Sequence, residues 1–151
     1  MSVGQICKRD VVTIRPIDDL ITAAQLMREK HVGFLVVVEP SFEEETYKPV
    51  GVLTDRDIVV AVIARGADPK TLRVDDVMTR QPVVALATES LEVALPKMRR
   101  MGVRRMPIVG MRGELVGVLS MDDVLDTIAT ELQNVAGAIR SEQMIEGALR
   151  S

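Results

Sequence analysis

Two short stretches of the chain carry residues whose types and spacing suit the binding of a phosphorylated sugar. The first is Gly51-Val-Leu-Thr-Asp-Arg-Asp57 and the second is Gly117-Val-Leu-Ser-Met-Asp-Asp123. Each runs from apolar residues to a hydroxyl residue, with a carboxylate three positions later. Free backbone N–H groups at a helix start can hold a phosphate, and the carboxylate can accept from ribose hydroxyls. Alone, either stretch also fits an ordinary strand-to-helix turn, but the repetition favours binding.

The rest of the chain repeats around these two stretches. Apolar residues match at an offset of 71 residues: Val3 with Val74, Val12 with Val83, Leu20 with Leu91, and Met27 with Met98. The offset falls to 66 at Gly51 and Gly117, so the first copy carries five extra residues. They lie within 39–48, where Glu43, Glu44 and Glu45 predict a solvated hairpin connection.

Both copies predict the same order of elements: a short lead-in, an extended run, an amphipathic helix, two strands joined by a hairpin, and a second helix. The first copy places them at residues 3–7, 11–14, 20–27, 33–38, 50–53 and 54–65, and the second at 74–78, 83–86, 91–101, 105–109, 115–119 and 121–140. The candidate N-caps are Asp18 or Asp19, Thr54 or Asp55, and Thr88 or Ser90. Pro96 predicts a bend in its helix.

The last helix is longer than a half-domain needs. Its apolar residues keep a spacing of three and four: Val124, Leu125, Ile128, Leu132, Val135 and Ile139. From Met121 to Arg140 it would span about 30 Å at ~1.5 Å per residue. We expect its end to pack against a second subunit, although folding back onto its own domain would also cover the stripe.

Composition excludes several classes of function. The 151 residues carry a formal charge of −3 and three aromatic side chains, which argues against a basic, base-stacking nucleic-acid surface. No apolar run reaches membrane-spanning length, and no signal peptide is evident. The single cysteine, Cys7, fits a reducing cytoplasm. With His31 as the only histidine, we predict no metal site, no catalytic residues and no enzyme activity.

The twofold β-α-β-β-α unit, each copy ending in Gly-h-h-[Thr/Ser]-x-x-Asp before a helix, resembles the CBS domain, named from cystathionine β-synthase. Two such domains in tandem form a CBS pair, or Bateman module. The resemblance covers about residues 3–135, and Thr54-Asp-Arg-Asp-Ile-Val59 and Val74-Asp-Asp-Val-Met-Thr79 are similar to small stand-alone bacterial members. It implies an α+β (mixed α/β) fold in which two sheets pack with pseudo-twofold symmetry and leave two clefts.

The resemblance also implies domain bounds. We expect the first repeat at 1–73, with the acidic loop 39–48 and a linker at 66–73. The second repeat is expected at 74–135, and a C-terminal helical extension at 136–151. Family members commonly form homodimers through their helices.

The resemblance further implies the site residues. Asp57 and Asp123 would accept the ribose hydroxyls of one ligand each, and Thr54 and Ser120 would donate beside the helix starts. In the family, the opposite half holds the adenine. The Asp57 site would therefore use Met78, Val83, Val103, Arg104 and Met106, and the Asp123 site Cys7, Val12, Val32, Gly33 and Phe34, with Asp122 beside it. Arg105 matches a basic position that often reaches phosphates, and Arg56 is near enough to help.

Two functions from different classes follow. The first is a regulatory sensor that binds an adenosyl ligand and signals to a separate, unknown protein partner by conformational or oligomeric change. AMP is the first choice of ligand; ADP, ATP, NAD and S-adenosylmethionine also occur in the family, and no cofactor is required. The second is a ligand-free structural or protein-interaction module.

Overall fold

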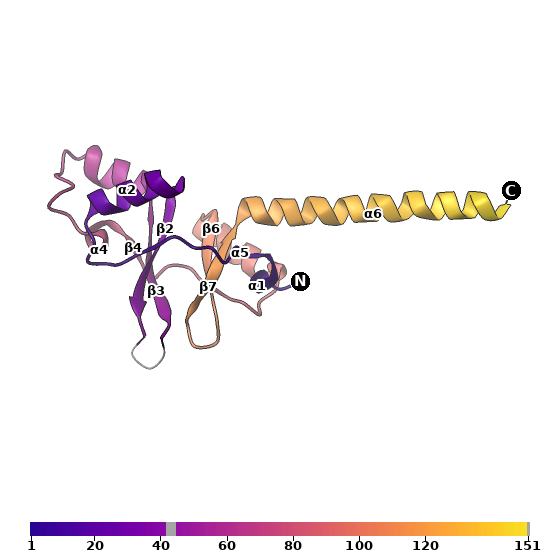
Figure 1. The fold of residues 1–151 in the computed structure, drawn as a ribbon, viewed down its shortest axis with the longest axis horizontal. Helices are drawn as coiled ribbons and strands as arrows, with labels where there is room; N and C mark the ends of the chain where they lie inside the picture. The colour runs from indigo at the N-terminus through magenta and orange to yellow at the C-terminus, as the bar shows by residue number, and fades with distance from the viewer. Residues whose placement is uncertain (42–44, 151) are drawn as a thin grey trace.

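The computed structural model describes residues 1–41 and 45–150 of the chain. The first half contains α1 (Val3–Ile6), β1 (Thr13–Ile14), α2 (Leu20–Lys30), β2 (Phe34–Pro40), β3 (Tyr47–Thr54), α3 (Asp55–Ile58) and the π-helix η1 (Val59–Ile63). The second half contains α4 (Val74–Val77), β4 (Thr79–Arg80), β5 (Ala85–Leu86), α5 (Leu91–Met101), β6 (Arg105–Val109), β7 (Leu115–Ser120) and α6 (Met121–Arg150). The predicted mixed α+β order is confirmed (Figure 1).

The strands form two sheets that share one plan. The first has the order β1-β2-β3-β4 and the second the order β5-β6-β7. In each, a short parallel strand precedes an antiparallel hairpin, and the register slips once within that hairpin, between Val37 and Val38 or between Ile108 and Val109. The hairpin of the first half is longer, since β2 and β3 extend into both ends of the predicted loop 39–48, at residues 39–40 and 47–48. Glu43 and Glu44 of that loop lie outside the described residues.

Each half has its own hydrophobic core. Leu20, Leu35 and Leu53 are fully buried in the first, and Met98 and Leu119 in the second. Burial of such side chains stabilises the fold by about 25 cal/mol for each Å² of apolar surface removed from water. This free energy drives the packing of α2 and α5 onto their sheets.

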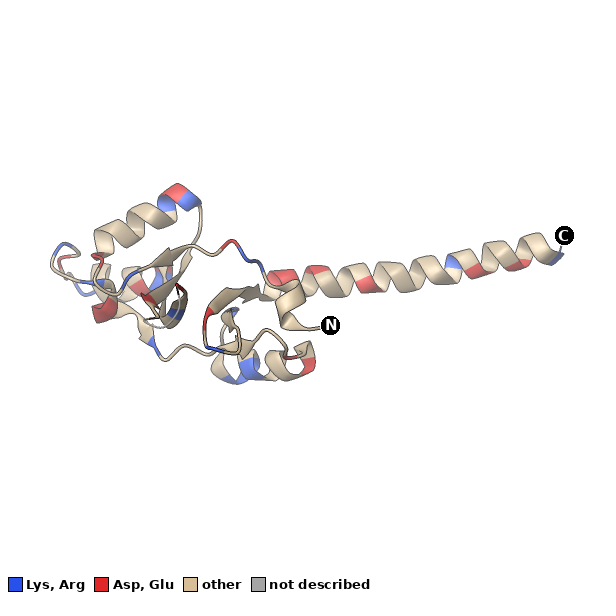
Figure 2. Cartoon of the chain, turned by 60° about the horizontal axis from the view of Figure 1, so that its bottom comes forward, with Lys and Arg blue, Asp and Glu red and all other residues tan. Residues whose placement is uncertain are grey.

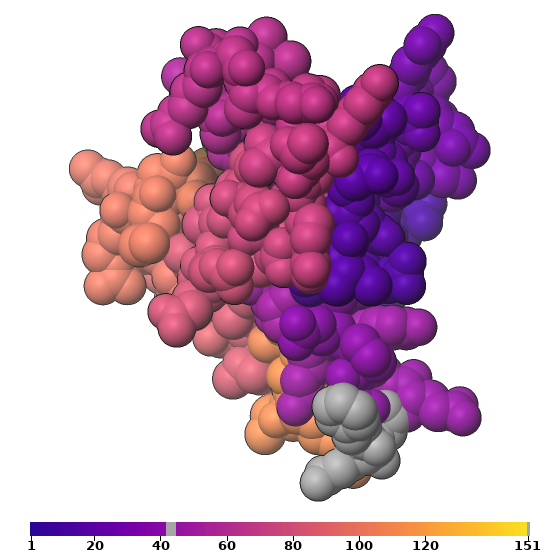
Figure 3. Space-filling view, turned by 90° about the vertical axis from the view of Figure 1, so that its left-hand side faces the viewer, coloured from indigo at the N-terminus to yellow at the C-terminus, as the bar shows by residue number. Residues whose placement is uncertain are grey.

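The two lead-in helices are exchanged between the halves. Val3 of α1 is fully buried in the core of the second half, and Val74 of α4 is fully buried in the core of the first. The residues that follow continue the exchange, because Lys8 pairs with Val118 of β7 and Thr79 pairs with Val52 of β3. In Figure 3 the pink middle of the chain lies against the indigo N-terminal region.

The structure decides between the candidate N-caps of α2 and α5. Asp19, and not Asp18, caps α2, and its carboxylate accepts from the Thr22 N–H at 2.6 Å. Ser90 takes the N-cap position of α5, which continues through Pro96. Met101 continues the apolar spacing of the predicted helix 91–101, with Ala94 and Met98, but it is exposed, because it lies in the last turn of α5, where the helix leaves the core.

The last helix differs most from expectation. It runs unbroken to Arg150 and projects away from the body of the molecule, so it does not fold back on its own domain (Figure 1). Its acidic residues lie in the first turns, in the middle and near the C-terminal end (Figure 2), and only Val124 is buried. Beyond that residue the apolar stripe is open, with Leu125, Leu132 and Val135 each more than half exposed.

Candidate functional site

The predicted motif at the end of β3 folds into a closed hydrogen-bonded turn. Thr54 ends the strand in an extended conformation, and α3 begins at the next residue. The Thr54 N–H donates to Asp57 Oδ2 at 2.9 Å, and the Asp57 N–H donates to Thr54 Oγ1 at 3.1 Å. This reciprocal cap fixes the Asp57 side chain at the helix start, where the dipole favours an acceptor. Thr54, and not Asp55, is therefore the cap.

A cleft of about 590 Å³ opens beside this turn, and we call it the Asp57 cleft. Both halves of the chain line it: Gly33, Phe34, Val52, Thr54, Asp55, Arg56, Asp57, Thr79, Arg80, Gln81, Pro82, Val83, Met101, Gly102, Val103, Arg104, Arg105 and Pro107. Its charged residues are four arginines and two aspartates, so the lining is net positive. A cationic lining of this kind favours an anionic ligand.

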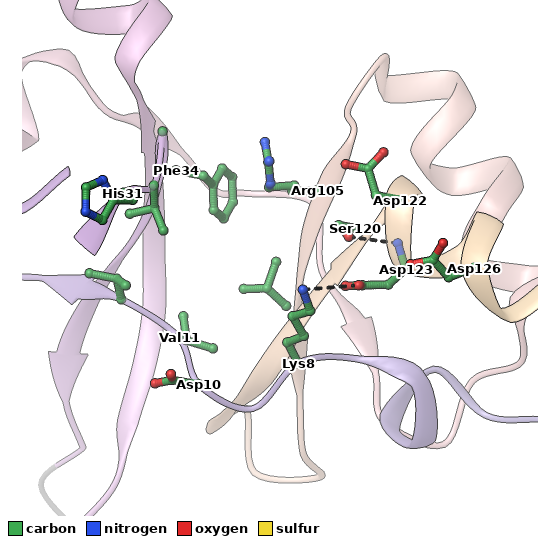
Figure 4. Close-up of a pocket in the computed structure, with 14 residues that line it drawn as sticks. Lys8, Asp10, Val11, His31, Phe34, Arg105, Ser120, Asp122, Asp123 and Asp126 are labelled. Carbon is green, nitrogen blue, oxygen red and sulfur yellow. Dashed lines mark hydrogen bonds and ion pairs between the residues drawn. The ribbon is translucent and has the colours of Figure 1, made fainter. Parts of the chain in front are cut away.

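The equivalent turn at the end of β7 has a different partner. The Asp123 N–H donates to Ser120 Oγ at 3.1 Å, as in the first turn. Its carboxylate forms an ion pair with Lys8, with 3.4 Å between Nζ and Oδ1 (Figure 4). The Asp123 side chain is only 15% exposed, whereas that of Lys8 is 75% exposed. Lys8 comes from the exchanged N-terminal segment, so the opposite half completes this turn.

A second cleft, the Asp123 cleft, has a volume of about 350 Å³. It is lined by Lys8, Asp10, Val11, Val12, His31, Val32, Gly33, Phe34, Arg105, Val118, Ser120, Asp122, Asp123 and Asp126. Here four carboxylates face two cations and one histidine, so the charge balance is opposite to that of the Asp57 cleft. In Figure 4, Asp122, Asp123 and Asp126 lie on one side of this cleft, where Lys8 reaches Asp123, and Asp10 and His31 lie on the other.

Most predicted site residues are brought together in these clefts. The Asp57 cleft contains Thr54, Arg56, Asp57, Val83, Val103 and Arg104, and the Asp123 cleft contains Val12, Val32, Gly33, Phe34, Ser120, Asp122 and Asp123. Arg105 lines both clefts. Each cleft is therefore lined by residues from both halves of the chain.

Three predicted residues do not line a cleft. Met106 is fully buried and faces the core, while its neighbour Pro107 lines the Asp57 cleft. Met78 packs against the first core. Cys7 is buried in the second core beside Gly117, where a Cβ would lie 2.7 Å from its sulfur. Burial raises the pKa of the Cys7 thiol, which keeps it protonated and unreactive.

Several lining residues were missed in the sequence. Lys8, His31 and Arg80 are the charged or titratable examples with the clearest positions. Lys8 and Thr79 match at the offset of the repeat, and each follows a lead-in helix, so the repeat contained the signal for this wall of each cleft. His31 ends α2 with a left-handed φ of 55°, and it also lines the Asp123 cleft.

Among residues 1–41 and 45–150, no three His, Cys, Asp or Glu side chains form a group that could hold a metal ion. Within the same ranges, no helix is both long and apolar enough to cross a membrane.

Comparison with protein families identifies this arrangement. The CBS domain model matches the chain twice, at residues 3–64 and 74–130. The chain belongs to the CBS-domain family. Its two matched domains are the two halves described above, and the predicted CBS pair is confirmed.

Relatives and solved structures agree with this assignment. An uncharacterized protein of Methanopyrus kandleri is 37% identical over 83% of this chain, which spans 61% of that relative's length. The hexameric CBS-CP12 protein from bloom-forming cyanobacteria has a TM-score of 0.70 and 34% identity, over 83% of this chain and 66% of its own. The CBS domain protein PAE2072 from Pyrobaculum aerophilum, complexed with AMP, has a TM-score of 0.71 and 29% identity, over 86% of this chain and 99% of its own.

Proposed function

We propose that this CBS pair is a regulatory sensor that binds an adenine nucleotide, with AMP as the first choice, in the Asp57 cleft. The observation that carries the proposal is the capped helix start of α3 at the edge of a cleft lined by four arginines. Such a site offers a carboxylate for a ribose and positive charge for a phosphate. The likeness to a CBS protein complexed with AMP supports the same ligand class.

Each part of the nucleotide has a candidate partner in this cleft. Asp57 retains acceptor capacity beyond the bond from Thr54, so it can accept from ribose hydroxyls. Charge-assisted hydrogen bonds of this kind contribute about 1.5–3 kcal/mol each. Val83 and Val103 come from the second half and offer apolar surface to the adenine. Arg56 and Arg105 line the same cleft and offer positive charge to the phosphate.

The output of the sensor is self-association or contact with a separate protein. The exposed stripe of α6 provides the surface, because Leu125, Ile128, Leu132, Val135 and Ile139 follow the 3-4-3-4 spacing of a coiled coil. We propose a homodimer through this helix, read by a partner protein whose identity is unknown. A reducing compartment such as the cytoplasm suits the free, buried Cys7.

The same stripe favours a second candidate function, a protein-interaction module with empty clefts. In that case the α6 surface would act without a ligand. The two functions differ in whether an adenosyl ligand stabilises the fold.

A ligand panel tests the proposal. Thermal denaturation of the protein would be followed with AMP, ADP, ATP, NAD and S-adenosylmethionine, alongside Asp57→Ala and Asp123→Ala. A ligand at 100 times its Kd should stabilise the native state by about 2.7 kcal/mol. Stabilisation of the wild type by AMP that is reduced in Asp57→Ala supports the sensor and its assignment to the Asp57 cleft. No stabilisation by any of the five ligands would favour the interaction module.

A further inference from the structure

The two clefts share one wall. Gly33, Phe34 and Arg105 line both of them. Phe34 stands opposite Thr54 in the β2–β3 register, and Arg105 stands opposite Ser120 in the β6–β7 register. Each is therefore the cross-strand neighbour of one capping residue. The Arg105 Cζ lies 6.0 Å from the centroid of the Phe34 ring, so the guanidinium spans from the second half to the first (Figure 4).

This guanidinium is not committed to an acid. Within the part of the chain that the structure describes, Arg105 forms no ion pair with a carboxylate, and its contact is the ring of Phe34. A cation 6.0 Å from the centroid of a half-buried aromatic ring is held only weakly, so a phosphate that entered either cleft could draw it away.

The two clefts depend on this cation to different degrees. Among the described residues that line the Asp123 cleft, the only other lysine or arginine is Lys8, which is already paired with Asp123. In the Asp57 cleft, Arg56 and Arg80 also line the wall, as does Arg104, whose guanidinium lies 3.8 Å from the Asp122 carboxylate. A phosphate in the Asp123 cleft would therefore need Arg105, whereas one in the Asp57 cleft has alternatives.

We propose that Arg105 is a shared phosphate ligand that couples the two clefts negatively and sets their order of filling. This rests on the proposed function, since it requires nucleotide binding. An anionic nucleotide fills the Asp57 cleft first and draws the guanidinium toward it. The Asp123 cleft then keeps four carboxylates against the paired Lys8, so its affinity for a second anion falls.

The coupling can be measured by calorimetric titration with AMP. Titration of Asp57→Ala gives the Kd of the Asp123 cleft for AMP while the Asp57 cleft is empty. The second step of the wild-type titration gives the same Kd while the Asp57 cleft is filled. The Kd of that second step should be weaker than the Kd of Asp57→Ala by on the order of tenfold, within the range of known coupling between sites. If Asp57→Ala fails to fold, Val83→Trp replaces it, because a bulky side chain at this lining position would block the Asp57 cleft and leave the Thr54–Asp57 turn intact.

Arg105→Gln separates this mechanism from simple repulsion between two anions. In proteins that carry Arg105→Gln, the Kd of the Asp123 cleft should be nearly the same whether the Asp57 cleft is filled (second step of the titration) or disabled by Asp57→Ala. Added to Asp57→Ala, Arg105→Gln should weaken AMP binding by on the order of tenfold, and added to Asp123→Ala by only a few-fold. Arg140→Gln, which removes the same charge from the exposed part of α6, is the matched control and should change none of these values.

Three results would overturn the coupling while leaving the sensor intact. They are an unchanged ratio of Kd values in Arg105→Gln, tighter binding at the second step, or AMP binding to Asp123→Ala with none to Asp57→Ala. Absence of AMP binding to the wild type would instead refute the proposed function itself.

Discussion

At the scale of single residues, Asp57 and Asp123 occupy equivalent positions in different surroundings. The Asp57 carboxylate is held by the backbone of Thr54, whereas the Asp123 carboxylate is held by the side chain of Lys8. Ribose hydroxyls could donate to the Asp57 carboxylate without breaking its hydrogen bond from the Thr54 N–H. At Asp123, a ribose would compete with an ammonium group for the same oxygens, which agrees with the filling order proposed above.

The first prediction concerns the charge of Asp57. Asp57→Asn keeps the shape and one acceptor oxygen but removes the charge that strengthens bonds from ribose hydroxyls. AMP binding should weaken by a factor of about 10 to 100, equivalent to ~1.4–2.7 kcal/mol, with little change in melting temperature. Calorimetry and thermal denaturation measure the two quantities. Glu92→Gln, on α5 outside both clefts, is the control, and an equal loss of AMP binding there would contradict the assignment.

The second prediction uses the cap of α2. The Thr22 N–H donates to Asp19 and lowers the pKa of that carboxyl below its ordinary value of 3.8. Because the folded pKa is the lower one, Asp19 stabilises the native state above the unfolded pKa, and this is lost as the pH falls through the folded pKa. Asp19→Ala should therefore melt below the wild type at neutral pH.

The difference in melting temperature between the wild type and Asp19→Ala should narrow as the pH falls below 3.8. Circular dichroism melts at neutral pH and at about pH 3 would show it. Glu29→Ala, an exposed acid at the other end of α2, is the comparison. A difference between wild type and Asp19→Ala that is independent of pH would mean that the cap does not act through its charge.

Residue-level prediction from sequence succeeded where the signal was local. Thr54 and Asp57 are three positions apart, so the turn that joins them follows from the motif itself. Met106 was assigned to a cleft because neither its register nor the face of β6 was known. A shift of one residue along a strand exchanges the two faces, and Pro107 takes the cleft position instead.

At the scale of elements, α6 shows where periodicity stops being informative. The regular apolar stripe ends at Ile139, and the predicted helix ended with it at Arg140. The structure continues to Arg150 through Glu, Gln, Met, Ala and Leu residues, which favour helix without forming a continuous stripe. The sequence therefore predicted the helix and its exposed face but not its length.

The third prediction tests the stripe of α6 as a self-association surface. Leu132 is 65% exposed at the centre of the 3-4-3-4 pattern, where a partner helix would bury it. Leu132→Glu should shift the sedimentation profile toward a single chain of 16.6 kDa, because an unpaired carboxylate would be buried at the contact. Gln133→Glu adds the same charge beside the stripe and should leave association unchanged.

Equal effects of the two substitutions would point to general charge repulsion. A wild type that sediments as a single chain at every concentration would rule out the homodimer through α6.

At the scale of the whole molecule, the exchanged lead-ins tie the two halves together. The repeat, the order of elements and the motif before the second helix of each copy together predict the CBS pair. Likeness between copies does not show which copy each lead-in packs against. The resemblance implied Cys7 and Met78 at sites of the opposite half, and the structure shows both lead-ins buried in the core of that half.

The fourth prediction follows from this exchange. Val3 and Val74 are both fully buried in the core of the opposite half. Val3→Ala and Val74→Ala should each lower the free energy of unfolding by about 2 kcal/mol, from lost burial and the cavity left behind. Urea denaturation should show one transition for each variant, since each half is completed by the other.

The control is Val93→Ala, a substitution at an exposed position of α5, which should cost less than about 0.5 kcal/mol. Two separate transitions in Val3→Ala would show that the halves unfold independently.

The central claim, a nucleotide sensor built on the Asp57 cleft, is tested most directly by a crystal structure of the protein grown with AMP. The account predicts AMP in the Asp57 cleft, with both ribose hydroxyls within hydrogen-bond distance of the Asp57 carboxylate and the phosphate facing Arg56 and Arg105. An empty Asp57 cleft at saturating AMP, or a nucleotide whose ribose is turned away from Asp57, would contradict it.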